Sequence, residues 1–513
     1  MSRAPRAGTG AQPPAQPPAQ PRARSRAWVG PLRACVVVLV GSGLVVAAMQ
    51  LPGTTQLGPT VAAAATAMPE LVAVTTAAVT CPGPETEGLS SVPPVSGTTT
   101  VLAATAPPAS LGGVTPATGP GAVTMTMRPG NTALATTSTR SAVVTGSLNG
   151  ASDAEVTASG SLAPGLAAVQ TFLHAAGDDR ALVSTPCLAP RADIWLVGGG
   201  GESTRRERIV LANPGGNTVT VDLSVLGAEG PVTLAGGADV TVPPHGRTTL
   251  LLDAIAGAET TPVVHVVATG GLLTAVLEDS WIDGALGRGA DDAAPAADPS
   301  LEQVVPAAVI DGPALLRVAS TGDQEAVVQT RVLTPSGPQP LPAAGVVRIP
   351  GGTVRDIDLG ALPAGAYAVQ VRSDQPVVAG AMVERRGRPG TQSDFAWISS
   401  SAPVSVVTGT PVPTGVSALL SLVATGSPAV AQVTTIDAAG TPTSQQVTVP
   451  ADSVTTAPAP PGGQVWVTHV SGVLRAGLTM STPATATAGA LFTAYALGPL
   501  AVSATQVPVR QVG

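Results

Sequence analysis

The sequence predicts a mainly β protein, in which tandem antiparallel β-sandwiches of the immunoglobulin or fibronectin kind follow one N-terminal transmembrane helix. Three observations favour this fold class. Related segments recur about one domain length apart, short alternating apolar runs are separated by Gly and Pro, and one long uncharged run lies near the N-terminus.

The composition of the 513 residues favours strands over disorder. Charged residues make up 11% of the chain and aromatic residues 2%, while Val, Thr and Ala supply much apolar surface that can be buried. All 25 basic residues are Arg, which fits a GC-rich coding bias. Six of them precede the first acidic residue, Glu70, so a basic tail is followed by an acidic body. This split indicates two compartments rather than nucleic-acid binding.

The N-terminal residues predict a membrane anchor. Residues 1–33 are rich in Pro and Arg and are expected to form a disordered cytoplasmic tail. Residues 34–51 are an uncharged run that just spans a bilayer, and 52–69 form a tether. A cleaved signal peptide is the alternative, although its apolar core is normally shorter. In both cases the body is exported, and the anchored form is a single-pass plasma-membrane protein.

Cys81 and Cys187 are the two cysteines beyond the apolar run. On the oxidising side of a membrane, two such thiols predict one disulfide, and two free thiols are the alternative. The bridge would close an N-terminal β unit, residues 70–190, that fits the repeat poorly. Within it, Ser90–Pro120 is expected to be loop, and the segments on either side of Gly177 a hairpin.

Three repeats follow, at residues 191–300, 301–402 and 403–513. They are aligned on Gly215, Gly322 and Gly426, which lie 107 and 104 residues apart. A β-branched residue follows ten positions after each glycine, and Val225, Val332 and Ile436 are therefore predicted to be equivalent inward-facing strand residues. Each repeat also has a strand ending in proline, which cannot donate to a continuing ladder.

The sequence argues against catalysis. Without Lys there is no phosphate-binding loop, SxxK acylase or pyridoxal Schiff base, and GxSxG and HExxH motifs are also absent. The four His do not fall at metal-ligand spacing. We expect no catalytic, cofactor-binding or metal-binding residue, and no enzyme activity.

Two small Arg clusters are the candidate ligand-binding residues. They are Arg205, Arg206 and Arg208, and Arg385, Arg386 and Arg388. Their guanidinium groups could hold an anionic envelope polymer in a cleft between domains. The simpler interpretation is that they are solvated loop charges paired with Glu202, Glu207 and Glu384.

Other conspicuous residues have simple structural interpretations. Asp291, Asp292 and Asp298 are expected to form an acidic linker, because their spacing matches no calcium loop. Gly198–Gly201 is expected to be a flexible connection. Trp281 and Trp397 are expected to seal the small cores rather than to stack on sugars.

Several motifs resemble a known family. They are Cys81-Pro82, Cys187 followed by Pro190, Trp195-Leu-Val-Gly-Gly199, Leu211-Ala-Asn-Pro214 and Ser393-Asp-Phe-Ala-Trp397. In these the chain is similar to an actinobacterial family of uncharacterised envelope proteins. The resemblance implies one N-terminal membrane segment and a long exported β-rich region, but no activity.

We therefore expect a non-enzymatic, membrane-anchored envelope protein that acts as a structural or interaction scaffold, with envelope polysaccharide or other envelope proteins as partners. The alternative is an accessory protein that binds an acidic envelope polysaccharide in an inter-domain groove.

Overall fold

The computed structural model describes residues 70–83, 97–177, 179–232, 236–284, 286–341, 345–385, 391–484 and 489–506. The chain divides into two compact units, Met1–Met68 and Pro69–Gly513, and every described residue lies in the second. The predicted tail, anchor and tether lie outside the described residues. No described helix is long and apolar enough to cross a membrane. The prediction of a mainly β protein with several antiparallel sheets is confirmed.

Sheet pair I (β2–β9) lies in the segment predicted to fit the repeat poorly. Its elements are β2 (Thr76–Cys81), β3 (Thr98–Thr105), η1 (Pro108–Ser110), β4 (Ala122–Arg128), β5 (Thr132–Thr137), β6 (Val144–Leu148), β7 (Asp153–Ser159), η2 (Gly160–Leu162), β8 (Leu166–His174) and β9 (Ala181–Pro186). The hairpin predicted around Gly177 is confirmed by the antiparallel pairing of β8 with β9. The prediction of loop over Ser90–Pro120 is wrong at β3. This Thr-rich segment is a strand that pairs with β6 and β8.

Sheet pair II (β10–β18) follows. It contains β10 (Asp193–Val197), β11 (Arg205–Asn213), β12 (Val219–Gly227), β13 (Gly230–Val232), β14 (Val240–Val242), β15 (Gly246–Leu251), α2 (Leu252–Ala256), β16 (Val263–Thr269), β17 (Thr274–Asp283) and β18 (Leu286–Ala293). Strand β12 alternates as the sequence predicts, with Val219, Val221, Leu223 and Val225 buried.

Sheet pair III (β19–β26) has two sheets that are continuous through one long strand. It contains β19 (Ser300–Ile310), β20 (Ala314–Ser320), β21 (Ala326–Thr334), β22 (Gly337–Pro340), β23 (Val346–Ile349), β24 (Val354–Asp358), β25 (Gly365–Glu384) and β26 (Phe395–Ser399). The first part of β25 pairs with β19 and β21, and its last part pairs with β20 and β26.

Sheet pair IV (β27–β34) completes the set. It contains β27 (Val407–Pro411), β28 (Ser417–Ala424), β29 (Ala429–Ile436), β30 (Pro442–Val449), β31 (Ser453–Ala459), β32 (Gln464–Ser471), β33 (Leu474–Ser481) and β34 (Phe492–Leu497). Outside the pairs, β1 (Glu70–Ala73) pairs with β35 (Ser503–Gln506), so the two ends of the described chain meet.

The four sheet pairs share one strand order. In pair I the first sheet runs β2-β7-β4-β5 and the second β6-β3-β8-β9, and corresponding strands take the same places in pairs II, III and IV. In each pair the two sheets bury their facing side chains in one hydrophobic core. The segment that the sequence set apart from the repeats therefore has the same strand order as the repeats.

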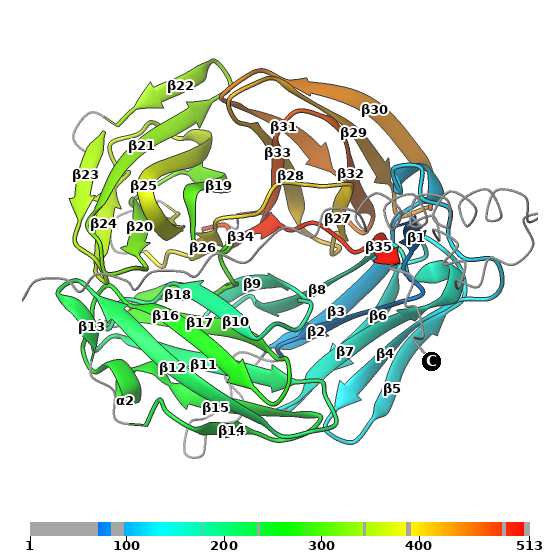
Figure 1. Cartoon of the computed structure of the whole chain (residues 1–513), viewed down its shortest axis with the longest axis horizontal. Helices are drawn as coiled ribbons and strands as arrows, with labels where there is room; N and C mark the ends of the chain where they lie inside the picture. The colour runs from blue at the N-terminus through cyan, green and yellow to red at the C-terminus, as the bar shows by residue number, and fades with distance from the viewer. Residues whose placement is uncertain are drawn as a thin grey trace, which may run out of the picture. The chain divides into compact units, whose positions relative to one another are not determined.

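The last strands of the four pairs lie side by side in a closed cycle. Strand β9 contacts β18, β18 contacts β26, β26 contacts β34, and β34 contacts β9, as can be followed at the centre of Figure 1. Each of them is an edge strand of its own sheet. Their edges are therefore covered by neighbouring pairs, which protects them from pairing with other chains.

The predicted core positions are confirmed for Val225 and Val332, which are fully buried in the cores of pairs II and III. The prediction is wrong for Ile436. This side chain is buried against pair I, in a cluster with Ala104, Leu111 and Trp466, and Val433 occupies the core of pair IV instead. A slip of one residue in the alignment moves a side chain to the other face of the sheet.

Candidate functional site

The cycle of last strands is held by polar side chains that reach from one sheet pair to the next. Asp291 of β18 accepts a hydrogen bond from the backbone N–H of Trp397 in β26, at 2.7 Å. Asp394, just before β26, accepts one from the N–H of Phe492 in β34, at 2.8 Å. These two aspartates are fully desolvated, and burial raises the pKa of each well above its ordinary value.

The remaining two contacts close the cycle. The hydroxyl of Thr493 in β34 accepts a hydrogen bond from the N–H of Ser184 in β9, at 3.1 Å, and donates to Asp291 at 3.0 Å. The hydroxyl of Thr185 in β9 donates to Asp292 of β18. Asp291 and Asp292 are therefore buried strand residues that join sheet pairs, and their interpretation as an acidic linker is wrong.

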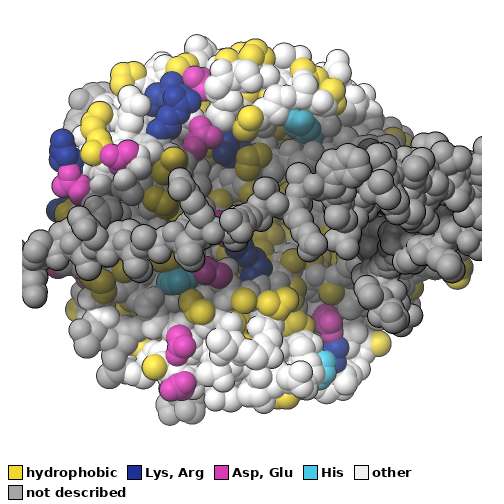
Figure 2. Space-filling view, viewed as in Figure 1, with side chains coloured by type: hydrophobic (Ala, Val, Ile, Leu, Met, Phe, Trp, Pro, Cys, Tyr) yellow, Lys and Arg dark blue, Asp and Glu magenta, His cyan; other side chains and the backbone are white. Residues whose placement is uncertain are grey.

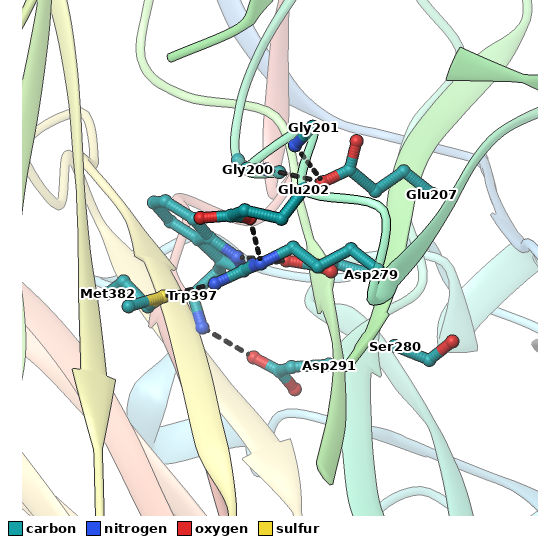
Figure 3. Close-up of polar contacts among 12 residues, drawn as sticks. Gly200, Gly201, Glu202, Glu207, Asp279, Ser280, Asp291, Met382 and Trp397 are labelled. Atoms are coloured by element: carbon teal, nitrogen blue, oxygen red, sulfur yellow. Dashed lines mark hydrogen bonds and ion pairs between the residues drawn. The ribbon is translucent and has the colours of Figure 1, made fainter. Parts of the chain in front are cut away.

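The contact between pairs II and III is built around Trp397. Its indole N–H donates to the Asp279 carboxylate at 2.9 Å, and its ring packs in the core of pair II. Figure 3 shows Asp279 facing this indole. Trp397 thus does seal a core, as predicted, but it is the core of the neighbouring sheet pair. Trp281 packs at the edge of the same core.

Arg205 neutralises this buried acidic group. Its guanidinium pairs with Asp279 and, at 2.9 Å, with Glu202, and it lies over the Trp281 ring at 4.4 Å from the centroid. Only 4% of its side chain is exposed. The cation is therefore fully engaged within the protein.

Glu207 lies beside the same group and holds the glycine segment in place. Its carboxylate accepts hydrogen bonds from the N–H groups of Gly200 and Gly201, as drawn in Figure 3. Burial raises the pKa of Glu207 to about 7, and the nearby Asp279 carboxylate adds to the increase. Burial also raises the pKa of Asp279.

Arg317 of β20 fastens pair III to the same glycine segment. It donates to the carbonyl oxygens of Gly198 and Gly199 at 3.1 and 2.7 Å, and it pairs with Asp356. Further bonds reach the carbonyls of Thr260 and Pro262. The expectation of a flexible connection at Gly198–Gly201 is therefore wrong, because both its N–H and its C=O groups have fixed partners.

A second charged layer lies between pairs I and II. Arg247 of β15 lies 3.6 Å from the carboxylate of Glu278. Burial raises the pKa values of Asp153 and Asp292, and the charge of Arg247 lowers them by a smaller amount. The net result is a pKa of about 7 for Asp153 and about 6 for Asp292. Arg208 lies in the same sheet, cross-strand from Glu278, and is 1% exposed.

The contact between pairs III and IV uses a further ion pair. Arg475 of β33 pairs with Glu302 of β19 at 3.1 Å and donates to the carbonyl of Ser401. Burial lowers the pKa of Arg475, which Glu302 partly offsets. Pairs IV and I also meet through apolar side chains, among them Trp466 and Leu111.

A cavity of about 320 Å³ lies where all four sheet pairs meet. It is lined by residues at or beyond the ends of β9, β18, β26 and β34, together with parts of β2, β8 and β27. Tyr495 of β34 lines it, and its hydroxyl lies 3.4 Å from that of Thr410. Burial raises the pKa of this phenol, so it stays neutral.

The four described Arg of the predicted ligand site have different surroundings. The interpretation of Arg205 and Arg208 as solvated loop charges is wrong, since both side chains are buried, and Arg205 lies at the contact between pairs II and III. Arg206 is exposed. Arg385 is partly buried over the Phe492 ring, 4.7 Å from its centroid, and burial lowers its pKa. Arg386 and Arg388 lie outside the described residues. Charged side chains on the described surface form small mixed groups in Figure 2.

The predicted disulfide is confirmed. Cys81 at the end of β2 is bonded to Cys187 just after β9, with 4.2 Å between the Cα atoms. The cavity and the cycle of last strands were missed by sequence reasoning. One signal was available, since Asp291 and Asp394 fall at matching places in two repeats, beside strand residues that otherwise read as buried.

Comparison with known proteins yields one family. Residues 142–461, more than half of the chain, match the sequence model described as "Family of unknown function (DUF5719)". A search of the curated proteins finds no match. The matched region begins just before β6 of pair I, ends just after β31 of pair IV, and includes β9, β18 and β26.

Proposed function

This chain belongs to the family of unknown function DUF5719, and we propose that it is a non-enzymatic scaffold of the cell envelope. One observation carries the proposal: the strongly perturbed carboxyl groups accept hydrogen bonds that join one sheet pair to the next. Perturbed titratable groups often mark catalytic sites, but structural networks perturb them equally. Here their partners are backbone N–H groups, an indole and a hydroxyl, which is the arrangement of a rigid framework.

Export is part of the proposal. We infer that residues 34–51 anchor the chain in the plasma membrane, with a cytoplasmic N-terminus and an extracytoplasmic body. The Cys81–Cys187 disulfide supports this topology, because such bonds persist in oxidising compartments. The actinobacterial envelope origin suggested by the sequence motifs belongs to the same proposal.

We also interpret each sheet pair as one β-sandwich related to the immunoglobulin and fibronectin folds. Two antiparallel sheets around one core support this interpretation. The strand limits support the proposed boundaries near residues 190, 300 and 402. Strand β9 ends at Pro186 and β10 begins at Asp193, β19 begins at Ser300, and β26 ends at Ser399 before β27 begins at Val407.

The second candidate, binding of an acidic envelope polysaccharide, has less support. Of the three Arg that enter repeat one, Arg206 alone has an exposed side chain. One exposed guanidinium is screened by salt and gives little affinity for a polymer.

The scaffold proposal is tested on the outer edge of pair IV. Strand β30 is an edge strand, and Thr443 and Gln445 on it are exposed. A photoreactive residue at either position, in the full chain expressed in its own host, is expected to give discrete high-mass adducts in the envelope fraction. The R317M variant, which loosens the contact between pairs II and III, should reduce the yield of these adducts if the partner spans several sheet pairs. Protein that remains free of adducts at β30 and at exposed positions on the edge strand β5 would contradict the scaffold proposal.

A further inference from the structure

The cavity at the meeting point of the four sheet pairs is a shared site. Residues from each pair line it, for example Ala167 from pair I, Ile194 from pair II, Ser400 from pair III and Leu497 from pair IV. A molecule bound there would contact all four pairs at once. Pockets of about 300–1,000 Å³ between structural units are the usual size and place for small-molecule sites.

Most of the lining is apolar and built from small side chains. Val79, Ala168, Leu188, Pro295 and Leu500 represent it. The volume of about 320 Å³ is about twice that of an engineered apolar cavity of 150 Å³ that stays dry and binds benzene. An apolar body of roughly ten heavy atoms or more therefore fits the space.

Three hydroxyl groups in the lining lack partners. Thr274, Ser400 and Ser401 are 2%, 2% and 6% exposed, and their side-chain oxygens form no hydrogen bond among the described residues. A buried hydroxyl without a partner is unfavourable. All three come from the pair II and pair III side of the cavity, which gives it a polar side.

The charge of the lining restricts the ligand further. Arg191 is the charged side chain among the residues that line the cavity, and it is already paired with Asp298. No charge in the described lining is left to balance that of a bound ion. A neutral ligand avoids the cost of placing an unpaired charge in this environment.

We propose that the cavity binds a neutral single-chain amphiphile, with its acyl chain along the apolar walls and its ester or hydroxyl groups on Thr274, Ser400 and Ser401. A sugar fits less well, because the unpartnered hydroxyls of the lining all come from one side and cannot satisfy a polar group on every face. Water alone also fits less well, because each ordered water needs two to four polar partners. This inference goes beyond the scaffold function and does not depend on it.

The probe is a decanoylglycerol with bromine on its acyl chain, added to the full chain in nanodiscs. Bromine quenches tryptophan on contact, and Trp397 lines the cavity. We expect saturable quenching by the probe, and loss of most of that quenching in W397F. Quenching that does not saturate, or that survives unchanged in W397F, would overturn the proposal.

Two sets of variants assign the binding. A402F places a larger side chain at an exposed alanine of the cavity rim and is expected to weaken binding at least tenfold, whereas A439F, at an exposed alanine away from the cavity, should leave it unchanged. The triple variant T274V/S400A/S401A should weaken the ester probe roughly tenfold but not a bromodecane probe.

The matched control for the triple variant is S421A. Ser421 is also buried with an unpartnered hydroxyl, but it does not line the cavity. Equal effects of S421A and the triple variant, or equal binding by A402F and the unmodified chain, would show that the probe does not occupy this site. A cavity that holds water alone would give no saturable probe binding, and this result would also overturn the proposal.

Discussion

The indole N–H of Trp397 donates to the carboxylate of Asp279 across 2.9 Å, although the two residues are 118 positions apart and belong to different sheet pairs. Trp397 is 2% exposed and packs in the hydrophobic core of pair II, the sheet pair that contains Asp279. One side chain therefore supplies both apolar packing and a hydrogen bond to the contact between pairs II and III.

Replacing Trp397 by Phe keeps an aromatic ring and removes the donor to Asp279. Leaving a buried carboxylate short of one partner is expected to lower the free energy of unfolding by about 1–3 kcal/mol. Urea denaturation measures this loss. W281F is the matched control, because Trp281 is only partly buried at the same core. Its replacement should lower the free energy of unfolding by less. Equal losses in the two variants would show that the hydrogen bond contributes nothing.

Replacing Arg317 is expected to lower the free energy of unfolding by a larger amount. It donates to four carbonyl groups of pair II and pairs with Asp356, with 2% of its side chain exposed. R317M leaves those groups unpaired at a buried contact and should lower the free energy of unfolding by about 3–5 kcal/mol. R348M is the control, since Arg348 is 71% exposed and should change stability by less than about 0.5 kcal/mol. A small effect of R317M in urea titrations would contradict the proposed role.

The buried carboxyl groups predict a pH dependence of stability. Glu207 and Asp153 have pKa values of about 7 in the folded protein, raised chiefly by burial. In the unfolded chain such groups have pKa values of about 4. Between about pH 4 and 7 the folded state therefore holds protons that the unfolded state has released, and stability falls as pH rises through this range.

Denaturation at pH 5 and pH 8 measures this slope, with about 1.4 kcal/mol expected for each unit of pKa difference. E207Q should flatten the slope, because Gln does not titrate. D298N should leave it unchanged, since Asp298 is largely exposed. Stability that rises between pH 5 and pH 8 would contradict the assigned direction of these pKa shifts.

The disulfide is expected to stabilise pair I. It links Cys81 and Cys187, which are separated by 106 positions, and a loop of that length corresponds to about 4–5 kcal/mol in the chain-entropy description. The C81A/C187A variant should melt at lower temperature than the unmodified chain, and a reducing agent should lower the melting temperature of the unmodified chain alone. Thiols that alkylate at both positions in exported, unreduced protein would refute the bond.

The sequence was most informative where structure is local. The alternation of Val219 to Val225 predicts β12, and the turn at Gly177 predicts the pairing of β8 with β9. Strand β3 could not be found this way, because it is buried on both faces and its Thr and Ala residues do not alternate with polar ones.

The site depends on contacts that local patterns cannot show. Ser184 and Thr493 are 309 positions apart, and their hydrogen bond exists only because the fourth sheet pair returns to the first. Asp291 and Asp292 were misread for a related reason. Buried acidic residues are rare, and only partners in other sheet pairs make them stable there. The cavity could not be predicted either, because its lining comes from all four sheet pairs.

The most direct test of the account is scanning calorimetry of the full chain, because the central claim is that four sheet pairs form one closed body. We expect one cooperative transition for all four pairs, with the calorimetric enthalpy equal to the van't Hoff enthalpy. R317M should split or broaden it, whereas R348M should not. Separate transitions for individual sheet pairs in the unmodified chain would contradict the claim.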